Sequence, residues 1–531
     1  MKVEVAALAL CLSLSATGCA RPARSPDAVD SAEKKLLPAR VRRLTNLEYE
    51  RSVSALLGTT VSVAVALPPE LRQDGYTPNA AQTSAASVAT ELDRLARELA
   101  GDAVKRRLAE LAPCHPLGDR ACALEFVRSF GRRAYRRPLT PVEETALLRA
   151  FDEGAADGAG FAGGAELVLR VLLQSPSFLY VSELGAHGAP GETVTLEAYE
   201  IASVLSYTVR GGPPDEELYA AAERGELSSA AGRERQARRL LGQRDTRHHF
   251  RRFVLEWLEV DGLERTAKSA ELFPEYEALK PAMLAETEAF VDEVMVNAGA
   301  SVKALLSAGF ASVEPQMARY YGLSTFGPRA NLRGTGRSGV LQQASFLSAH
   351  SHEDSTSPVK RGDFVMRRLL CTPHRRPAEL GIDLVIPAPS ATKTTRERFS
   401  AHVSDPSCAG CHRVMDPLGF AFENFDAAGR ARREENGVAV NPSGESELFG
   451  ERVAFRDSAE LSRVLAADAR VEECFARQAF RYFSAQSDKG VEASFLELRD
   501  DLDEKRRGSV IEELVSFVKS DLFVQREVPS P

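Results

Sequence analysis

The stretch RRLTNLEYERSVSALLG, Arg42 to Gly58, encodes both ends of a helix. Thr45 followed three residues later by Glu48 is a capping-box pattern, and the apolar residues after it recur near helical spacing. Gly58 suits the left-handed position just beyond a helix C-terminus. The stretch therefore predicts a helix with defined ends, and it indicates a helical fold.

Helical patterns continue along the chain, and residues typical of helix ends mark helix boundaries within them. We expect a long helix from about Ala81 through Leu111, and Thr140, Pro141 and Glu143 repeat the capping pattern at another helix start. Strand-like alternation is scarce. A chain of 531 residues is also too long for one hydrophobic core. The sequence therefore predicts a mainly α, multi-domain protein.

Composition and charge exclude one class of partner. The chain has 44% hydrophobic and 27% charged residues, which are ordinary globular values. Its net charge is −8, and its Lys and Arg residues are spread along the chain. A nucleic-acid-binding protein would instead carry a concentrated basic patch. We therefore expect no nucleic-acid partner.

The N-terminal residues MKVEVAALALCLSLSATGCA predict export. Their apolar run is too short to cross a bilayer, so residues 1–19 indicate a signal peptide rather than a membrane span. Small residues precede Cys19, as in bacterial lipoproteins, so we expect Cys19 to be lipidated and residues 20–38 to form a tether. The expected location is outside the cytoplasm, lipid-anchored to a bacterial membrane, with the outer membrane facing the periplasm or the surface favoured. An ordinary secretory signal is the alternative.

The stretch DPSCAGCHRVMDPLGFAFENFDAAGR, which begins at Asp405, carries the clearest chemistry. Random placement of 8 Cys and 9 His in this chain would give a Cys-x-x-Cys-His motif roughly 0.002 times. Cys408 and Cys411 can bond the two vinyl groups of one haem, and His412 then lies beneath the iron as its ligand. The motif predicts one covalent haem c in the C-terminal region. A redox disulfide or half of a zinc site are the alternatives.

The sixth iron ligand is open. Met415 lies too near His412 in the chain to cross to the other haem face, so we expect it to be a packing residue. Chemically possible ligands remain elsewhere: Met366, His350, His352 and His402. Ligation by Met or His would suit electron transfer, whereas an open sixth position would suit peroxide or oxygen chemistry.

The remaining cysteines predict two disulfides. Cys11 and Cys19 belong to the export segment, which leaves an even number in an oxidising compartment. Cys114 and Cys122 are close in sequence and should pair, and Cys371 should then pair with Cys474. The second bridge would close a loop of about a hundred residues, which the chain-entropy model values at roughly 4.7 kcal/mol.

Other reactive residues have simpler interpretations. His248 and His249 are neighbours on an expected helix and point about 100° apart, so we assign them, with Trp257, to packing and surface roles. The arginines from Arg132 to Arg137 indicate a solvated or ion-paired helix end. The acidic residues after the haem motif, in DPLGF and ENFD, indicate a turn and a helix end that support the haem segment; they are Asp416, Glu423 and Asp426.

Several stretches resemble one family. They are RRLTNLEYERSVSALLG, RRAYRRPLTPVEE, VLLQSPSFLY, HFRRFVLEWLEVDGL, GVLQQASFLSAHSHEDSTSPVKRGDFVMRRLLC and CAGCHRVMDPLGFAFENFDAAGR. In this order they are similar to the planctomycete-type surface cytochrome family, whose members join domains of unknown function 1587, 1595, 1592, 1588 and 1585. Relatives commonly carry a proline run where this chain has CTPHRRPAEL. The resemblance covers nearly the whole mature chain and implies architecture more than activity.

The sequence divides into five expected domains after the tether. Residues 39–112 form an N-terminal helical domain, residues 113–182 a helical domain with the RRAYRRPLT motif, and residues 183–325 a central helical domain. Residues 335–440 hold the haem motif, and residues 441–531 form a C-terminal helical domain packed with the haem region.

Electron transfer through one haem to an unknown redox partner is the first hypothesis for function. A haem-dependent peroxidase or oxidase acting on an extracellular substrate is the second, and a non-catalytic surface scaffold is the third.

Overall fold

A computed structural model describes residues 35–82, 85–112, 114, 120–372, 387–400, 404, 406–503 and 506–530. Within these ranges the protein is mainly helical, with short strands, as the sequence predicts. The predicted signal peptide, the lipidation site Cys19, most of the tether and the candidate ligand His402 lie outside the described residues. None of the described helices is both long and apolar enough to cross a membrane.

The helix ends that the sequence encodes are present. Helix α1 spans Asn46–Leu57, with the Thr45 side chain accepting a hydrogen bond from the backbone of Glu48 and Gly58 at φ 63° beyond its end. Helix α4, Pro141–Ala155, begins with the same reciprocal bonds, between Thr140 and Glu143. Local capping chemistry therefore sets these boundaries.

Helix α2 starts later than the sequence predicts, because it spans Ala86–Leu111 rather than beginning near Ala81. Side-chain amides hold the preceding residues in a loop: Asn79 Nδ2 and Gln82 Nε2 both donate to the carbonyl of Leu71, at 3.0 and 2.6 Å. Such side-chain bonds to backbone compete with helix formation, and they explain the difference.

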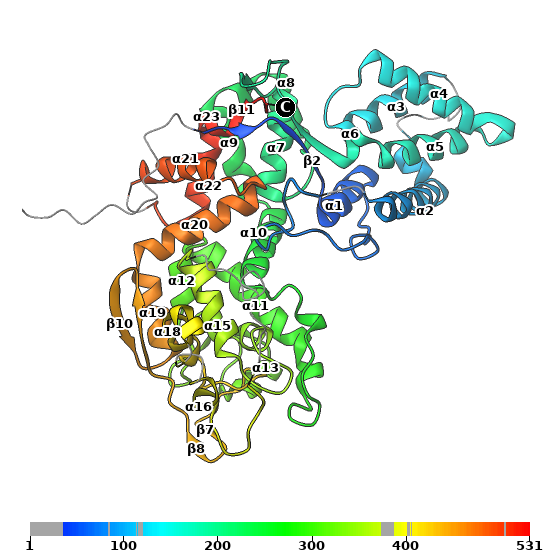
Figure 1. The fold of residues 1–531 in the computed structure, drawn as a ribbon. Coiled ribbons are helices and arrows are strands. Elements are labelled where there is room, and N and C mark those ends of the chain that lie inside the picture. The colour runs from blue at the N-terminus through cyan, green and yellow to red at the C-terminus, as the bar shows by residue number, and fades with distance from the viewer. Residues whose placement is uncertain are drawn as a thin grey trace, which may run out of the picture.

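The upper lobe contains helices α1 to α10 and α20 to α23 (Figure 1). Its remaining early helices are α3 Arg120–Tyr135, α5 Gly160–Gln174, α6 Pro176–Leu179, α7 Ala198–Arg210, α8 Glu216–Glu223, α9 Ala230–Leu241 and α10 Arg244–Trp257, with short 3₁₀ turns η1 Ala156–Gly158 and η2 Glu226–Ser228. The late helices are α20 Ala469–Ser484, α21 Lys489–Asp500, α22 Val510–Lys519 and α23 Asp521–Val524. Helices α2 to α5 pack on one another and project to one side (Figure 1).

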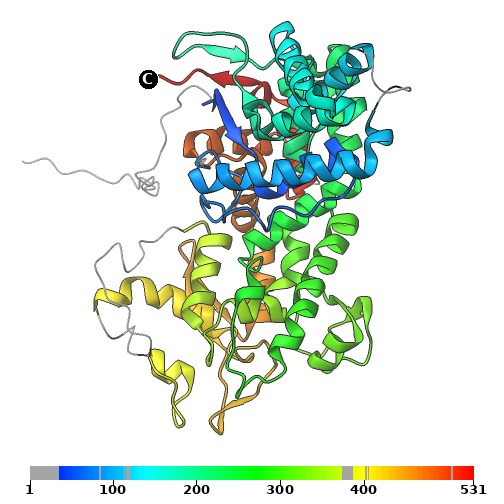
Figure 2. The same ribbon diagram turned by 90° about the vertical axis from the view of Figure 1, so that its right-hand side faces the viewer.

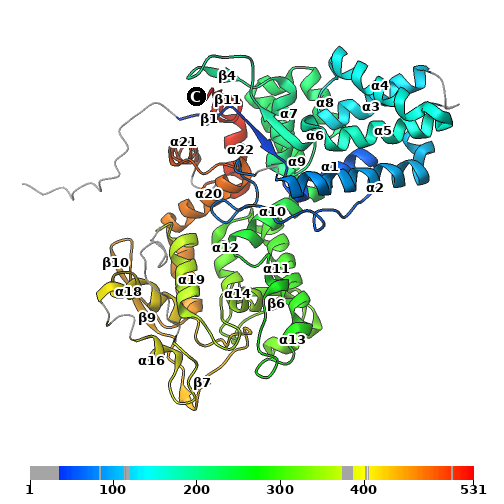
Figure 3. The same cartoon turned by 45° about the vertical axis from the view of Figure 1, so that its right-hand side comes forward.

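The lower lobe is formed by the middle of the chain, which lies beneath the upper lobe in two further views (Figures 2 and 3). Its helices are α11 Tyr276–Ala298, α12 Val302–Ser307, α13 Pro315–Tyr321, α14 Ala344–Ala349, α15 Pro358–Phe364, α16 Thr395–Phe399, α18 Pro406–Phe420 and α19 Ser458–Ala467. Shorter turns are η3 Leu263–Arg265, η4 Val340–Gln342 and the π-helix η5 Val365–Leu369.

The strands are short and pair in small sheets. They are β1 Leu37–Pro38, β2 Arg40–Arg43, β3 Tyr180–Glu183, β4 Thr193–Thr195, β5 Phe310–Val313, β6 Gly327–Asn331, β7 Glu434–Glu435, β8 Val438–Ala439, β9 Gly444–Leu448, β10 Glu451–Phe455 and β11 Gln525–Glu527. Four of the sheets are antiparallel pairs: β2 with β3, β5 with β6, β7 with β8, and β9 with β10.

One sheet joins the two ends of the described chain. Strand β11 pairs in parallel with β1, in the segment predicted to end the tether, and antiparallel with β4. A buried ion pair crosses the same region, because Arg526 Nη2 lies 2.7 Å from Glu183 Oε2 and Arg40 lies 3.1 Å from the other oxygen of Glu183. Both ends of the described chain are therefore packed into the upper lobe.

The hydrophobic core crosses both lobes. One cluster of buried side chains extends in sequence from Leu37 to Val524, and a smaller one contains Tyr276, Met283 and Met317. Trp257 is fully buried and contacts Phe364 of the lower lobe and Phe475 of the upper lobe. The predicted core role of Trp257 is confirmed.

Candidate functional site

Two helices cross closely at the Cys-x-x-Cys-His segment. Helix α18 packs against α15, and a Cβ added at Gly419 would clash with the carbonyl oxygen of Pro358. One helical turn away, Gly362 of α15 lies similarly close to α18, because a Cβ at Gly362 would meet the carbonyl oxygen of Met415. Two glycines, one on each helix, therefore permit the contact that positions α18.

The motif residues lie in the first half of α18. Cys408 is half-buried, Cys411 is exposed, and the His412 side chain is 17% exposed. Because residues three and four apart share a helix face, Cys408 lies beside both Cys411 and His412. The helix therefore presents the three donor side chains on one side, where Cys411 is exposed and Cys408 is half-buried.

Asp416 fixes the orientation of His412. The Nδ1 atom of His412 lies 2.7 Å from Oδ1 of Asp416, one helical turn further on, and the Asp416 side chain is 1% exposed. A carboxylate accepts hydrogen bonds, so this geometry favours the tautomer with its proton on Nδ1. The other ring nitrogen, Nε2, then carries the lone pair that can bind a metal.

The interpretation of DPLGF as a turn is wrong. Asp416 to Phe420 form the last part of α18, with Pro417 inside the helix. The strand β9 packs over this end, because Ser446 Oγ donates to the carbonyl of Val414 at 3.0 Å and a Cβ at Gly444 would approach the carbonyl of Pro417. The β9–β10 hairpin therefore packs against the part of α18 that contains Pro417, which the sequence alone did not predict to be helical.

The segment after α18 is anchored by buried charges. Glu423 accepts hydrogen bonds from Thr356 Oγ1 at 2.8 Å and Arg432 Nη2 at 2.7 Å. Burial raises the pKa of the Glu423 carboxyl, and these neighbours act against that rise. Arg361, also fully buried, donates to the carbonyl of Phe422, while Asp426 accepts from two backbone amides of the next turn. These bonds hold the chain that leaves α18.

The candidates for a sixth ligand lie in different settings. His350 is buried, its Nε2 lies 2.9 Å from the carbonyl oxygen of Leu258, and its ring lies 4.4 Å from that of Phe346. His352 is half-buried in the following loop, and burial lowers the pKa of both histidines. Met366 is buried in the π-helix η5, which contacts α18. The structure therefore places the His350 ring in the core.

Met415 is buried against α15 and serves as a packing residue, as the sequence predicts. Over the described ranges, no three or more His, Cys, Asp or Glu side chains are grouped so that they could hold a metal ion.

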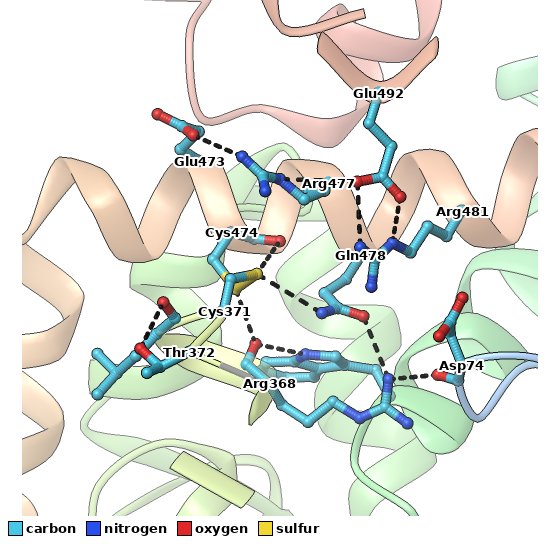
Figure 4. Close-up of a disulfide and its surroundings, with 12 residues drawn as sticks. Asp74, Arg368, Cys371, Thr372, Glu473, Cys474, Arg477, Gln478, Arg481 and Glu492 are labelled. Carbon is cyan, nitrogen blue, oxygen red and sulfur yellow. Dashed lines mark hydrogen bonds and ion pairs between the residues drawn. A yellow bond between two sulfur atoms is a disulfide. The ribbon is translucent and has the colours of Figure 1, made fainter. Parts of the chain in front are cut away.

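Both expected disulfides are present. Cys114 pairs with Cys122, with Cα atoms 5.7 Å apart, and Cys371 pairs with Cys474, with Cα atoms 5.5 Å apart. The second bridge joins the end of η5 to α20 (Figure 4). Cys371 has φ 47°, a left-handed conformation beyond the end of η5, and the amide of Thr372 donates to the carbonyl of Met366 at 2.9 Å.

Polar contacts surround this bridge and connect the lobes. Gln478 of α20 accepts from the guanidinium of Arg368 at 3.2 Å (Figure 4). It also accepts from the hydroxyl of Tyr76 at 2.9 Å. Arg368 also donates to the carbonyl of Asp74 at 2.8 Å, and its own carbonyl accepts from Trp257 Nε1. The π-helix η5, which contacts α18, is thereby linked to the upper lobe by a disulfide and by hydrogen bonds.

The arginine-rich helix end has two parts. Arg132 pairs with Glu216 and Glu223, and Arg137 pairs with Glu143, so these side chains are ion-paired as expected. Arg136 differs because it is buried, with φ 60°, and donates to the carbonyls of Ser177, Phe178 and Tyr180. These carbonyls are in α6 or adjoin its C-terminus, where helices leave unsatisfied acceptors.

The adjacent histidines do not form a metal pair. His249 is buried against the rings of Tyr482 and Phe483, and burial lowers its pKa to about 3. His248 is only partly buried on the neighbouring face. The sequence interpretation of packing and surface roles is confirmed.

A cleft of about 790 Å³ lies in the upper lobe. Its lining includes three tyrosines, Tyr135, Tyr180 and Tyr199. Val41 and Ser182, which are paired across strands β2 and β3, also line it. All of its lining residues come from residues 39–203 and the C-terminal Val528 and Pro529. The cleft is therefore built by other elements than α15 and α18.

Four family models match consecutive parts of the chain. They are PSD3, a protein of unknown function (DUF1587), at residues 42–105; PSD5 (DUF1595) at residues 122–183; PSD4 (DUF1592) at residues 196–323; and PSCyt3 (DUF1588) at residues 337–435. The last match contains the α18 motif. No curated protein and no solved structure matches the chain. The domain 1585 and the domain limits expected from the sequence stay predictions.

Sequence reasoning missed the role of Asp416. The signal was present, because His412 and Asp416 are four residues apart, the spacing at which two side chains meet on a helix. The interpretation of DPLGF as a turn places Asp416 outside a helix, and the four-residue spacing then predicts no contact with His412.

Proposed function

The chain belongs to the family of planctomycete cytochrome-like proteins that join domains 1587, 1595, 1592 and 1588, and from this premise we propose that it is a c-type cytochrome that transfers electrons through one covalent haem. The observation that carries the proposal is the donor set on α18. Cys408 and Cys411 would form the thioethers, and Nε2 of His412 would bind the iron.

The chemistry of these residues fits haem attachment. The thiols and the imidazole lie on one side of a helix, and the hydrogen bond from Nδ1 to Asp416 leaves Nε2 as the metal-binding nitrogen. Metal-binding histidines usually donate their other ring N–H to such an acceptor. A bound haem would supply one-electron redox chemistry, while the chain holds the ligand, excludes water behind α18 and fixes the position of the group.

Electron transfer is favoured over peroxide or oxygen chemistry. A haem enzyme needs a chamber for its substrate beside the iron, whereas an electron carrier needs only an approach within reach of a partner. The cleft in the upper lobe is lined by residues distant in sequence from α18. We therefore propose a redox protein as the partner.

The location belongs to the same proposal. Covalent haem of this type is attached outside the cytoplasm, and the N-terminal sequence predicts export and lipidation at Cys19. The two disulfides suit an oxidising compartment. We propose a lipid-anchored protein at a bacterial membrane, with the outer membrane facing the periplasm or the surface favoured.

The ferric spectrum tests electron transfer against enzyme chemistry. The protein matured with haem should be six-coordinate and low-spin, and millimolar cyanide should leave its absorption spectrum unchanged over minutes. His412→Ala should keep thioether-bound haem but lose the low-spin spectrum, whereas His187→Ala, which changes an exposed histidine of the upper lobe, should leave it unchanged. A high-spin ferric haem in the unaltered protein that binds cyanide readily would favour the peroxidase or oxidase hypothesis instead.

A further inference from the structure

Asp416 forms a short hydrogen bond to the proposed iron ligand. Its Oδ1 lies 2.7 Å from Nδ1 of His412, a distance typical of a charge-assisted hydrogen bond. Both residues belong to α18, so the backbone of one helical turn sets their separation. The close crossing with α15 at Gly362 and Gly419 holds that turn in place. The contact is therefore part of a rigid element.

The setting of Asp416 strengthens its effect on the imidazole. The carboxylate side chain is 1% exposed, so water screens its charge only weakly. A buried carboxylate that accepts the Nδ1 proton makes the imidazole a more basic ligand. A more basic ligand and a nearby negative charge both stabilise the ferric form, which carries one more positive charge than the ferrous form.

We infer that Asp416 is a positioning residue that orients His412 and lowers the reduction potential of the haem. The inference rests on the proposed haem attachment and deepens it, because it names the residue that tunes the potential. In this role the electron would be exchanged between the haem iron and the redox partner protein, while the hydrogen bond between Asp416 and His412 stays formed and no proton is transferred.

A second buried acid of the same lobe provides a matched control. Glu423 follows the end of α18, is as deeply buried, and bonds to Thr356 and Arg432. Arg361 also lies 3.6 Å from it, so cations compensate its charge. Glu423→Gln and Asp416→Asn each remove one buried negative charge, but only the second changes the bond to His412.

The experiment compares midpoint potentials of the full-length haem-loaded proteins by spectroelectrochemistry. Asp416→Asn should shift the ferric–ferrous equilibrium at least tenfold toward the ferrous form. For one electron this raises the midpoint potential by at least 59 mV. Glu423→Gln should shift it less. Asp416→Glu, which keeps the carboxylate on a longer arm, should return the potential toward that of the unaltered protein. An Asn shift no larger than the Gln shift, or equal shifts for Asn and Glu, would overturn the inference.

Covalent haem, measured as the pyridine haemochrome in each protein, separates this inference from the proposed function. Absence of covalent haem from the unaltered protein would refute the proposed function. Covalent haem in all four proteins with an unshifted Asn variant would refute the role of Asp416 alone. If Asp416→Asn holds no haem while Asp416→Glu does, the orienting part of the inference is supported.

Discussion

Asp416 and Glu286 are both buried acids, and their partners decide what each does. Asp416 accepts from an imidazole, whereas Oε2 of Glu286 accepts from the hydroxyl of Tyr321 at 2.6 Å. The other oxygen of Glu286 is buried without a hydrogen-bond partner among the described residues. Burial raises the pKa of Glu286 from 4.5 to about 7. The folded protein therefore favours the protonated form of Glu286.

Protonation of Glu286 should make stability depend on pH. A folded-state pKa above the unfolded one gives stability that is fully present below pH 4.5 and is lost as pH rises toward about 7. Glu286→Gln removes this titration and keeps an acceptor for Tyr321. The variant should therefore gain about 1 to 3 kcal/mol in unfolding free energy relative to the unaltered protein between pH 5 and pH 8, measured by urea unfolding. A difference that stays constant over this range would contradict the assignment.

At the scale of single residues, the sequence predicted the donors but not what orients them. Cys408, Cys411 and His412 form a Cys-x-x-Cys-His motif, whose spacing predicts covalent haem attachment. Asp416 requires knowledge that the helix continues through Pro417, which depends on packing against α15 and β9. The partners of Glu286 are also set by tertiary structure, because Tyr321 lies on a different helix.

At the scale of elements, the crossing of α15 and α18 positions the helix that carries the Cys-x-x-Cys-His motif. Gly419 lies against Pro358 so closely that a methyl group would meet backbone rather than a movable side chain. Gly410 lies on the same helix and faces open space. The two glycines therefore belong to the same helix but differ in how closely other residues pack against them.

Gly419→Ala should destabilise the protein and Gly410→Ala should not. Overpacking against backbone costs about 1 to 3 kcal/mol, whereas Ala in an open helical position is neutral or stabilising by up to about 1 kcal/mol. Thermal and urea unfolding of the haem-free proteins would measure both changes. Equal stability of the two variants would show that the crossing is less tight than the structure indicates.

The Cys371–Cys474 bridge ties the end of η5, which contacts α18, to α20 of the upper lobe. It joins residues 103 apart, whereas Cys114 and Cys122 are 8 apart. A longer closed loop restricts the unfolded chain more. The two bridges should therefore differ in their effect on stability.

Replacing Cys371 and Cys474 together by Ser should lower the unfolding free energy by about 2 to 5 kcal/mol. The matched change of Cys114 and Cys122 to Ser should cost less. Denaturant unfolding under non-reducing conditions measures both, and a peptide map should show one bridge within a short peptide and one between distant peptides. A larger loss from the short-loop pair would contradict the loop argument.

At the scale of the whole molecule, the two ends of the described chain meet in one sheet, while the Cys-x-x-Cys-His motif lies in the lower lobe with α18 (Figure 1). Helix existence and helix ends could be predicted because they depend on neighbouring residues, as at Thr45 and Gly58. The pairing of β1 with β11 could not, because two-residue and three-residue strands carry no periodic signal. Arg526 and Glu183 likewise meet across most of the chain.

The proposed anchor can be tested on the intact cell. Cys19→Ser should move the protein from the membrane fraction to the soluble periplasmic fraction, because the acyl chains attach at Cys19. Cys11→Ser changes a cysteine within the predicted apolar run and should leave the protein on the membrane. Fractionation followed by immunoblotting reads out both variants. Continued membrane association of Cys19→Ser would contradict lipidation at this residue.

Covalent haem is the claim on which the account depends. The direct measurement is the pyridine haemochrome spectrum, with the intact mass, of the full-length protein produced together with the cytochrome c maturation machinery. The account predicts one covalent haem c per chain, which remains in Cys371→Ser/Cys474→Ser and is lost in Cys408→Ser/Cys411→Ser. A protein without covalent haem, or one that keeps it after both motif cysteines are replaced, would contradict the account.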